Sequence, residues 1–109
     1  MILKNKKFII SAAGDGIGFA ISKLIVDNGG TVYLTDIDQK KINKIRRNNK
    51  FKNKIFANQL DANNYNHVRE YFSSLSHLKK IDGLINNVGI AGPTKYIDKI
   101  TNEEWQNTI

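Results

Sequence analysis

The sequence predicts a single α/β domain built on a parallel sheet, and three observations support this. Short apolar runs alternate with amphipathic segments along the whole chain, which is the pattern of βαβ units. A glycine-rich turn joins the first apolar run to the first amphipathic segment. Apolar residues make up 40% of the 109 residues and charged residues 25%, a globular composition of a length that suits one domain.

Four short apolar runs are the predicted strands. The run around Ile9 reads as a buried strand, and the run around Tyr33 is the second strand. The run around Phe56 is a third, weaker strand. The predicted strands cover residues 7–11, 31–35, 54–58 and 82–86.

The segments between these strands have the periodicity of helices. The first helix is predicted over residues 17–26, the second over 37–47 and the third over 64–78. Asn28, followed by two glycines, ends the first. Its apolar residues at helical spacing are Ile17, Ala20, Ile21, Leu24 and Ile25.

A fourth helix is predicted to begin after the last strand. Thr101 and Glu104 have the spacing of a capping box, and Trp105 and Ile109 follow four residues apart. The sequence ends inside this helix without a C-cap signal. We therefore expect residues 1–109 to form one domain that is incomplete at its carboxyl end.

The composition excludes several classes of site. The chain has no Cys, which removes disulfides, thiolate zinc sites and a thiol nucleophile. The two histidines, His67 and His77, stand ten residues apart without further ligands around them, so we expect no metal site. No apolar run approaches the roughly 20 residues that span a bilayer, and the amino-terminal run is too short for a secretory signal. We expect a cytoplasmic protein with no membrane partner.

The net charge of +7 is concentrated in one segment. Residues 40–54 contain eight basic side chains and no acidic one, whereas the rest of the chain is close to neutral. Such a run could follow nucleic-acid phosphates, but binding segments usually add stacking aromatics. Lys outnumbers Arg 14 to 3 in the chain, and Phe51 is the run's one aromatic. We favour a solvated helix face and expect no nucleic-acid partner.

Residues 11–18 read Ser-Ala-Ala-Gly-Asp-Gly-Ile-Gly between the first strand and the first helix. Small residues at such a turn let backbone N–H groups approach a pyrophosphate at the positive end of the helix dipole. The strict G-x-G-x-x-G pattern fails at Phe19, whereas the looser T-G-x-x-x-G-x-G spacing fits Ser11, Ala12, Gly16 and Gly18. A purely structural turn is the alternative.

Carboxylates follow the next two strands. Asp36 ends the second strand, 18 residues after Gly18, where a carboxylate can accept the hydroxyls of an adenosine ribose. It would repel a 2′-phosphate, and the glycine loop has no basic residue to offset this, so NAD is favoured over NADP. The alternative role for Asp36 is to cap the next helix together with Asp38. Asp61 follows the third strand at the same predicted edge of the sheet.

The fourth strand runs into Asn86-Asn87-Val88-Gly89. Together with the glycine loop, Asp36, Asp61 and Trp105, this resembles the short-chain dehydrogenase/reductase family over all 109 residues, in order and spacing. The resemblance implies the amino-terminal half of a Rossmann-type doubly wound parallel sheet with strand order 3-2-1-4.

The resemblance also implies roles in cofactor binding. The loop would cradle the pyrophosphate with the Ile17 N–H in contact, Asp36 would hold the ribose, and Asn86 would tie the central strands together. Ala12 stands where the family has its first glycine, so we expect an altered loop geometry. Val88 replaces a usual alanine near the cofactor. The implied cofactor-binding residues are Ser11, Ala12, Asp15, Gly16, Ile17, Gly18, Asp36, Asp61, Ala62, Asn87 and Gly89.

In the family that this sequence resembles, the chemistry rests on a Ser, a Tyr-x-x-x-Lys pair and an Asn that follow the helix with the Trp. No tyrosine here has Lys four residues later, and the nearest look-alike, Tyr65 with Arg69, falls on the third predicted helix. We therefore expect no catalytic residue in this chain. It would supply the NAD-binding part of an oxidoreductase that acts on an alcohol or ketone. Family members are roughly twice as long, and only the full-length enzyme is expected to form homo-oligomers.

Two other functions fit parts of the sequence. A non-catalytic nucleotide-binding half-domain needs only the glycine loop and the acidic residues. A fragment of a Rossmann-type methyltransferase also has a glycine loop and an acid after the second strand, but it does not require Asn86-Asn87-x-Gly89. As the amino-terminal half of such a sheet, the isolated chain is expected to associate or unfold partly, because the fourth strand leaves an open apolar edge.

Overall fold

The structure is a computed structural model that describes residues 2–12 and 14–86. It confirms the four predicted strands and the first three predicted helices. The predicted fourth helix and the sequence from Asn87 onward lie outside the described residues. The described elements are β1 (Lys7–Ser11), α1 (Gly16–Asp27), β2 (Thr31–Asp36), α2 (Gln39–Arg46), the short 3₁₀ helix η1 (Asn49–Phe51), β3 (Ile55–Gln59), α3 (Tyr65–Ser74) and β4 (Gly83–Asn86).

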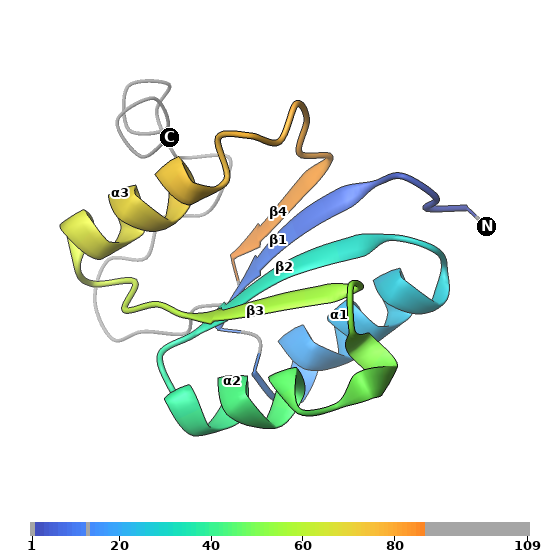
Figure 1. The fold of residues 1–109 in the computed structure, drawn as a ribbon, viewed down its shortest axis with the longest axis horizontal. Helices are drawn as coiled ribbons and strands as arrows, with labels where there is room; N and C mark the ends of the chain where they lie inside the picture. Colours follow the sequence, from blue (N-terminus) through green and yellow to red (C-terminus); the bar gives the residue numbers. More distant parts are fainter. Residues whose placement is uncertain (1, 13, 87–109) are drawn as a thin grey trace.

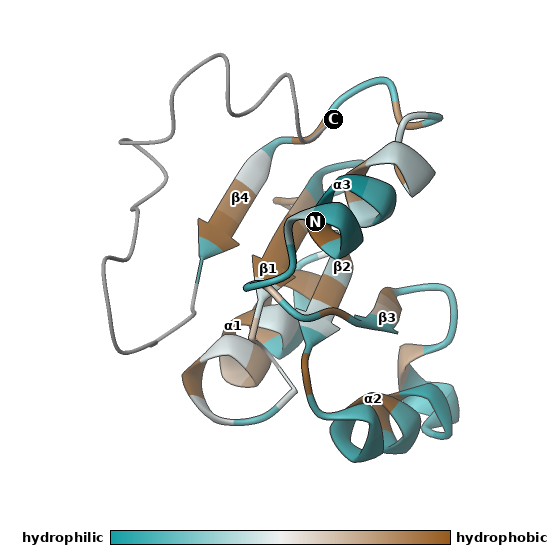
Figure 2. Cartoon of the chain, turned by 90° about the vertical axis from the view of Figure 1, so that its left-hand side faces the viewer, coloured by the Kyte–Doolittle hydropathy of each residue, from teal (hydrophilic) through white to brown (hydrophobic). Residues whose placement is uncertain are grey.

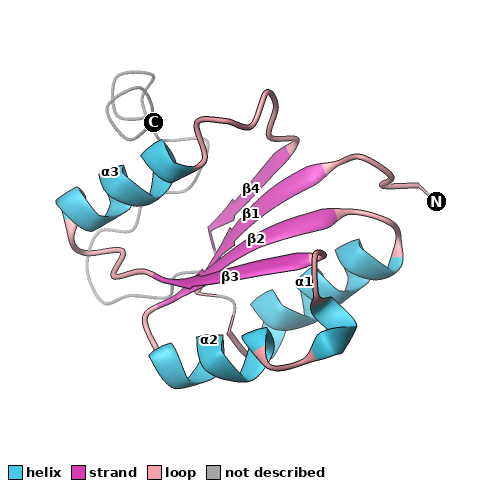
Figure 3. Ribbon diagram, viewed as in Figure 1, coloured by secondary structure: helices cyan, strands magenta, loops and turns pink. Residues whose placement is uncertain are grey.

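The four strands form one parallel sheet in the order β3-β2-β1-β4, as predicted. In the middle of the sheet Ile9 is in register with Tyr33 on one side and with Leu84 on the other. Figure 1 and Figure 3 show α1 and α2 on one face of the sheet and α3 on the other. The chain therefore folds as three layers, and the carboxyl ends of all four strands lie at one edge.

Alternate residues of the strands build a core on each face of the sheet. Ile10 and Leu34 are fully buried in a cluster that α1 and α2 cover. Ile9 and Tyr33 point the other way and pack with Tyr71 of α3. The apolar strands β1 and β4 contrast with the largely polar surfaces of α2 and α3 in Figure 2. A strand buried on both faces has no polar side, which is why apolar residues follow one another directly at the centres of β1 and β2.

The helix α1 packs differently from its apolar pattern. Ile17 and Leu24 are 74% and 63% exposed, whereas Ser22 is fully buried. The Ser22 hydroxyl donates to the carbonyl of Gly18 at 2.9 Å, so its burial leaves no unpaired donor. The buried residues of α1 are Gly18, Ser22 and Ile25, so two small residues lie on the face of the helix that covers the sheet.

The ends of the other helices follow local capping. The second helix begins at Gln39, two residues later than predicted, because the Asp38 carboxylate accepts from the Lys40 N–H and caps it. The third ends at Ser74, earlier than predicted, and Leu78 still packs against the core from the turn that follows. Among the described residues no helix is long and apolar enough to cross a membrane.

Candidate functional site

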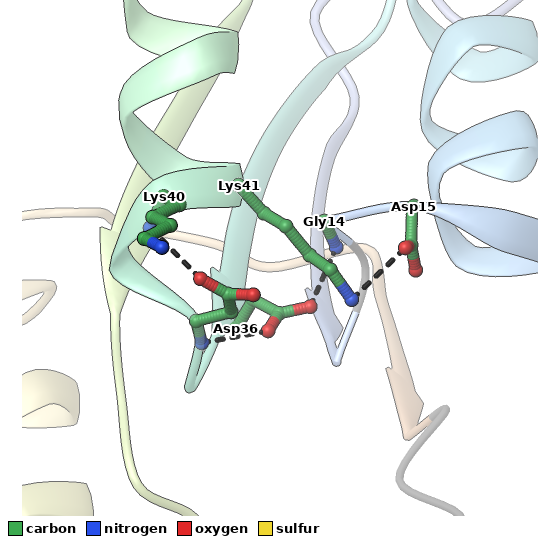
Figure 4. A network of polar contacts seen from close by, with 6 residues as sticks. Gly14, Asp15, Asp36, Lys40 and Lys41 are labelled. Atoms are coloured by element: carbon green, nitrogen blue, oxygen red, sulfur yellow. Dashed lines mark hydrogen bonds and ion pairs between the residues drawn. The ribbon is translucent and has the colours of Figure 1, made fainter.

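The glycine loop and the end of β2 meet at the carboxyl edge of the sheet. Ser11 ends β1, the loop leads into α1 at Gly16, and Asp36 ends β2 beside them. Figure 4 shows the loop, Asp36 and the first turn of α2 converging on one corner of this edge. In open parallel sheets ligands bind at such an edge, which makes this corner the candidate site.

The carboxylate of Asp36 is fixed between the loop and α2. Its Oδ2 accepts the backbone N–H of Gly14 at 2.9 Å, and its Oδ1 accepts the N–H of Asp38 at 2.9 Å. The residue is only 7% exposed. Because Asp38 caps α2 through its own side chain, Asp36 is not the capping residue of that helix. A carboxylate has about four acceptor positions, and these two backbone contacts occupy one on each oxygen.

Gly14 is required here although it was not among the predicted site residues. A Cβ on Gly14 would lie 2.8 Å from Asp36 Oδ2 and 2.8 Å from the Cβ of Lys41. The loop therefore approaches β2 and α2 as closely as a backbone without a side chain allows. The looser motif does not require glycine at this position, so the sequence pattern gave no specific reason to select it.

Ala12 adopts a left-handed backbone with a φ of 52°. The sequence predicted that an alanine in place of glycine would alter the loop, because its Cβ disfavours positive φ. In the structure Ala12 adopts a positive φ despite its Cβ, which costs an L-residue roughly 1–2 kcal/mol. Gly16 also has a positive φ, of 63°, and a Cβ there would meet no atom within 4 Å. The outer surface of the loop is therefore open at Gly16.

The amino-terminus of α1 has no side-chain cap. Asp15 occupies the N-cap position with a φ of −153°, but its side chain makes no cap hydrogen bond, and the first turn contains no acidic residue. Its carboxylate pairs instead with the Lys41 ammonium at 2.9 Å. Gly18 is buried against the sheet while the Ile17 side chain is exposed. The first N–H groups of α1 thus lie at the positive end of the helix dipole without a protein carboxylate on them.

The ends of β1 and β4 are joined by side chains. The Ser11 hydroxyl donates to Oδ1 of Asn86 at 2.9 Å, and the two residues are in register. This confirms the predicted role of Asn86 in tying the central strands together. The neighbouring predicted site residues Asn87 and Gly89 lie outside the described part of the chain.

Asp61 builds the turn after β3. Its carboxylate accepts the N–H of Asn63 at 2.9 Å, and its own N–H donates to Nδ1 of His67 at 3.2 Å. Leu60 donates its N–H to the carbonyl of Asp36 at 2.9 Å, which joins the start of this turn to the end of β2. Ala62 is exposed beside it. Both predicted residues therefore lie at the carboxyl edge of the sheet, and the Asp61 carboxylate already has a partner within its turn.

Lys41 is the second residue of the site that the sequence did not single out, since it lies in the basic run assigned to a solvated face. The hydrogen bond to Asp15 raises the pKa of Lys41 above its ordinary value, and the negative charges of Asp36 and Asp38 raise it further. The sequence alone does not show which loop the side chain of a lysine on a helix will contact. Across residues 2–12 and 14–86 no group of three or more His, Cys, Asp or Glu is placed to hold a metal ion.

Comparison with known proteins adds to this geometry. The model of a family described as short chain dehydrogenase matches residues 6–109. Cyclopentanol dehydrogenase of Comamonas testosteroni is 29% identical over 108 residues, which cover 94% of this chain and 42% of that protein. NADP-dependent 3-hydroxy acid dehydrogenase of Salmonella typhi is 26% identical over 102 residues, which cover 93% of this chain and 40% of that protein.

A solved structure agrees with the sequence relatives. The crystal structure of 2-keto-3-deoxy-D-gluconate dehydrogenase from Streptococcus agalactiae superposes with a TM-score of 0.71 at 27% identity, over 95% of this chain and 40% of that chain. The chain spans about two fifths of the length of the curated relatives named above. Because the family model covers nearly every residue and the Rossmann-type sheet has the predicted strand order, the chain belongs to the short chain dehydrogenase family.

Proposed function

We propose that this chain forms the dinucleotide-binding part of an oxidoreductase that transfers hydride between a nicotinamide cofactor and an alcohol or ketone. The observation that carries the proposal is the position of Asp36, held by the Gly14 N–H beside the glycine loop. The proposal is also supported by the membership of the chain in the short chain dehydrogenase family. Because the chain spans about two fifths of those relatives, the activity and the substrate class of the whole protein belong to the proposal.

The residues of the corner fit a dinucleotide. Asp36 has acceptor positions left after its two backbone contacts, enough for the two hydroxyls of a ribose. The uncapped N–H groups at the start of α1 suit a pyrophosphate. The open space above Gly16 leaves room for phosphate oxygens next to the backbone. The ribose hydroxyls would therefore bind to Asp36, and the pyrophosphate to the N–H groups of α1, at the same edge of the sheet.

The nicotinamide of the bound cofactor supplies or accepts the hydride. The residues of this chain bind and orient the adenosine end, so their contribution is to position the cofactor. The sequence contains no Tyr-x-x-x-Lys, and we assign proton transfer to no residue among these 109. We propose NAD as the preferred cofactor, because the carboxylate of Asp36, which the Gly14 N–H holds at this corner, opposes the negative charge of a 2′-phosphate.

Binding measurements test this function. We expect calorimetric titration to show that NADH binds and that S-adenosylmethionine does not. Asp36→Asn removes the negative charge that accepts the ribose hydroxyls, so NADH should bind about tenfold or more weakly, since hydrogen bonds to charged groups contribute about 1.5–3 kcal/mol. The matched control is Asp27→Asn, the same change on an exposed residue at the far end of α1.

Two outcomes would overturn the proposal. Binding of S-adenosylmethionine without NADH would favour the methyltransferase alternative. Equal loss of NADH affinity in the Asp36 and Asp27 variants, with native circular dichroism in both, would remove Asp36 from the site.

A further inference from the structure

We propose that Lys41 determines how strongly the site discriminates between NAD and NADP, a proposal that rests on the cofactor site proposed above. Lys41 lies on α2, outside the glycine loop. Its ammonium nevertheless reaches Oδ2 of Asp15 at 2.9 Å. In Figure 4 its side chain extends from α2 past Gly14 to Asp15, over the corner that contains Asp36.

The backbone fixes Lys41 close to Asp36. A Cβ on Gly14 would be 2.8 Å from the Cβ of Lys41 and equally close to Asp36 Oδ2, so Lys41 and Asp36 flank the same glycine. The hydrogen bond to Asp15 raises the pKa of Lys41, and the charges of Asp36 and Asp38 raise it further. Lys41 is therefore positively charged at neutral pH, beside the position proposed for the ribose.

The charges at this corner decide which ribose it accepts. Asp15, Asp36 and Lys41 together carry one net negative charge, and without Lys41 they would carry two. NAD brings a neutral 2′-hydroxyl to Asp36, whereas NADP brings a phosphate monoester with about two negative charges. Lys41 lowers the repulsion of that phosphate, and its flexible ammonium can turn from Asp15 toward it as a point charge. Asp15 opposes this by holding the ammonium at the loop.

Other basic residues of the segment 40–54, to which Lys41 belongs, lie away from the candidate site. Arg46 donates from its Nε to the carbonyl of Ala57 at 2.8 Å and so ties α2 to β3. Lys50 and Lys54 line a pocket beside the beginning of β3, at the opposite edge of the sheet. In the described part of the chain, Lys41 is thus the member of the run whose side chain pairs with a carboxylate at the candidate site.

The ratio of the dissociation constants for NADPH and NADH, measured by calorimetry on the protein at its native length, tests the proposal. Lys41→Gln should raise this ratio about tenfold, the effect of one unit charge a few ångström from a phosphate at a protein surface. Lys41→Arg retains the charge and should leave the ratio near that of the wild type. Asp15→Asn frees the ammonium and should lower the ratio about tenfold.

The matched control is Lys52→Gln, which removes the same charge at an exposed position between η1 and β3. It should change the ratio less than twofold. If Lys41→Gln changes the ratio no more than this control, in a protein that binds NADH, the proposal for Lys41 is wrong and the cofactor site stands. If the wild-type protein binds neither dinucleotide, the proposed function fails and the proposal for Lys41 fails with it.

A second measurement needs no cofactor. The pKa of the Lys41 ammonium, followed by NMR in the unliganded protein, should fall in Asp15→Asn and stay unchanged in Lys52→Gln. An unchanged pKa in Asp15→Asn would show that the ion pair is absent in solution and would overturn the proposal.

Discussion

The backbone N–H of Gly14 donates to the carboxylate of Asp36 across 2.9 Å, which joins the loop after β1 to the end of β2, 22 residues later. This bond fixes the distance between the two parts of the proposed dinucleotide site. It exists because Gly14 has no Cβ, since an added methyl would fall 2.8 Å from the same carboxylate oxygen. The geometry of the site therefore depends on a glycine whose role is close approach.

Gly14→Ala tests this dependence. The new methyl would overlap both the Asp36 carboxylate and the Cβ of Lys41. Because the Lys41 Cβ is attached directly to the backbone of α2, it cannot move away easily. We expect a loss of about 1–3 kcal/mol in the free energy of unfolding, which is typical of overpacking. NADH affinity should fall at least tenfold because Asp36 is displaced. Unfolding in urea and calorimetric titration measure the two effects, and unchanged values in both would contradict the close contact.

Much of the fold could be predicted from sequence because each strand carries its own signal. Ile9 and Tyr33 lie in short, continuously apolar runs, and a parallel sheet buried on both faces produces that pattern. The orientation of α1 could not be predicted. Its apolar residues extend over much of the helix surface, so the pattern does not show that the small Gly18 and Ser22 face the sheet while Ile17 faces solvent.

The sequence pointed to only some of the residues that meet at the candidate site. Gly16 lies within a motif of fixed spacing, and Asp36 directly follows an apolar run that predicts a strand, so the sequence named both residues. Gly14 and Lys41 belong to the site through contacts between separate elements, a loop against β2 and α2 against α1. Such contacts depend on how the elements pack. The spacing of residues along one segment gives no information about them.

Ala12→Gly should stabilise the protein. Ala12 has a φ of 52°, where an alanine is strained and a glycine is not. Part of the gain is lost to the greater freedom of glycine in the unfolded chain, so we expect a net increase of about 0.5–1 kcal/mol in the free energy of unfolding. The control is Ala20→Gly, the same substitution at an exposed position within α1. There we expect a loss of about 1 kcal/mol. Losses of equal size in both variants would show that Ala12 is not strained.

Tyr71→Phe should also stabilise the protein. The Tyr71 hydroxyl is buried and has no hydrogen-bond partner among the described residues. Removal of an unsatisfied buried group should raise the free energy of unfolding by about 1 kcal/mol. Tyr65→Phe makes the same change at a residue that is 58% exposed, and should have an effect within about 0.5 kcal/mol. A clear loss of stability in Tyr71→Phe would mean that the hydroxyl has a partner in solution.

The same tyrosine predicts a response to alkaline pH. Burial raises the pKa of the Tyr71 hydroxyl above the ordinary value of 10.0. Above that pH the unfolded chain releases a proton that the folded chain keeps, so stability should fall as the pH rises. Tyr71→Phe should reduce this fall but not abolish it, because burial also raises the pKa of Tyr33. Urea unfolding at pH 8 to 11 measures the difference, and identical pH profiles would contradict it.

Asp82 predicts the response to acid. Its carboxylate accepts the backbone N–H of Lys7 at 2.9 Å and pairs with Lys80 at 3.3 Å. These contacts lower the pKa of Asp82 below its ordinary value of 3.8. Below about pH 4 the Asp82 carboxylate of the unfolded chain binds a proton, whereas the carboxylate of the folded chain stays ionised. The stability that Asp82 contributes is therefore present at neutral pH and is lost as the pH falls.

Asp82→Asn should therefore be less stable than the wild type at pH 7, and the difference should shrink as the pH falls below about 4. Unfolding curves between pH 2 and 7 test this. Glu70→Gln, on the exposed face of α3, provides the control and should follow the wild-type profile. A constant difference between Asp82→Asn and the wild type at every pH would show that the charge of Asp82 is not the cause.

The most direct test of the cofactor site is to map NADH binding onto the backbone by ¹H–¹⁵N NMR. We predict that NADH shifts the amide signals of Gly14, Gly16, Ile17 and Asp36, which lie at the carboxyl edge of the sheet. Signals of Phe51 and Lys54, which line the pocket at the opposite edge, should stay in place. Shifts confined to Phe51 and Lys54, or the absence of any shift at saturating NADH, would contradict a dinucleotide site at the glycine loop.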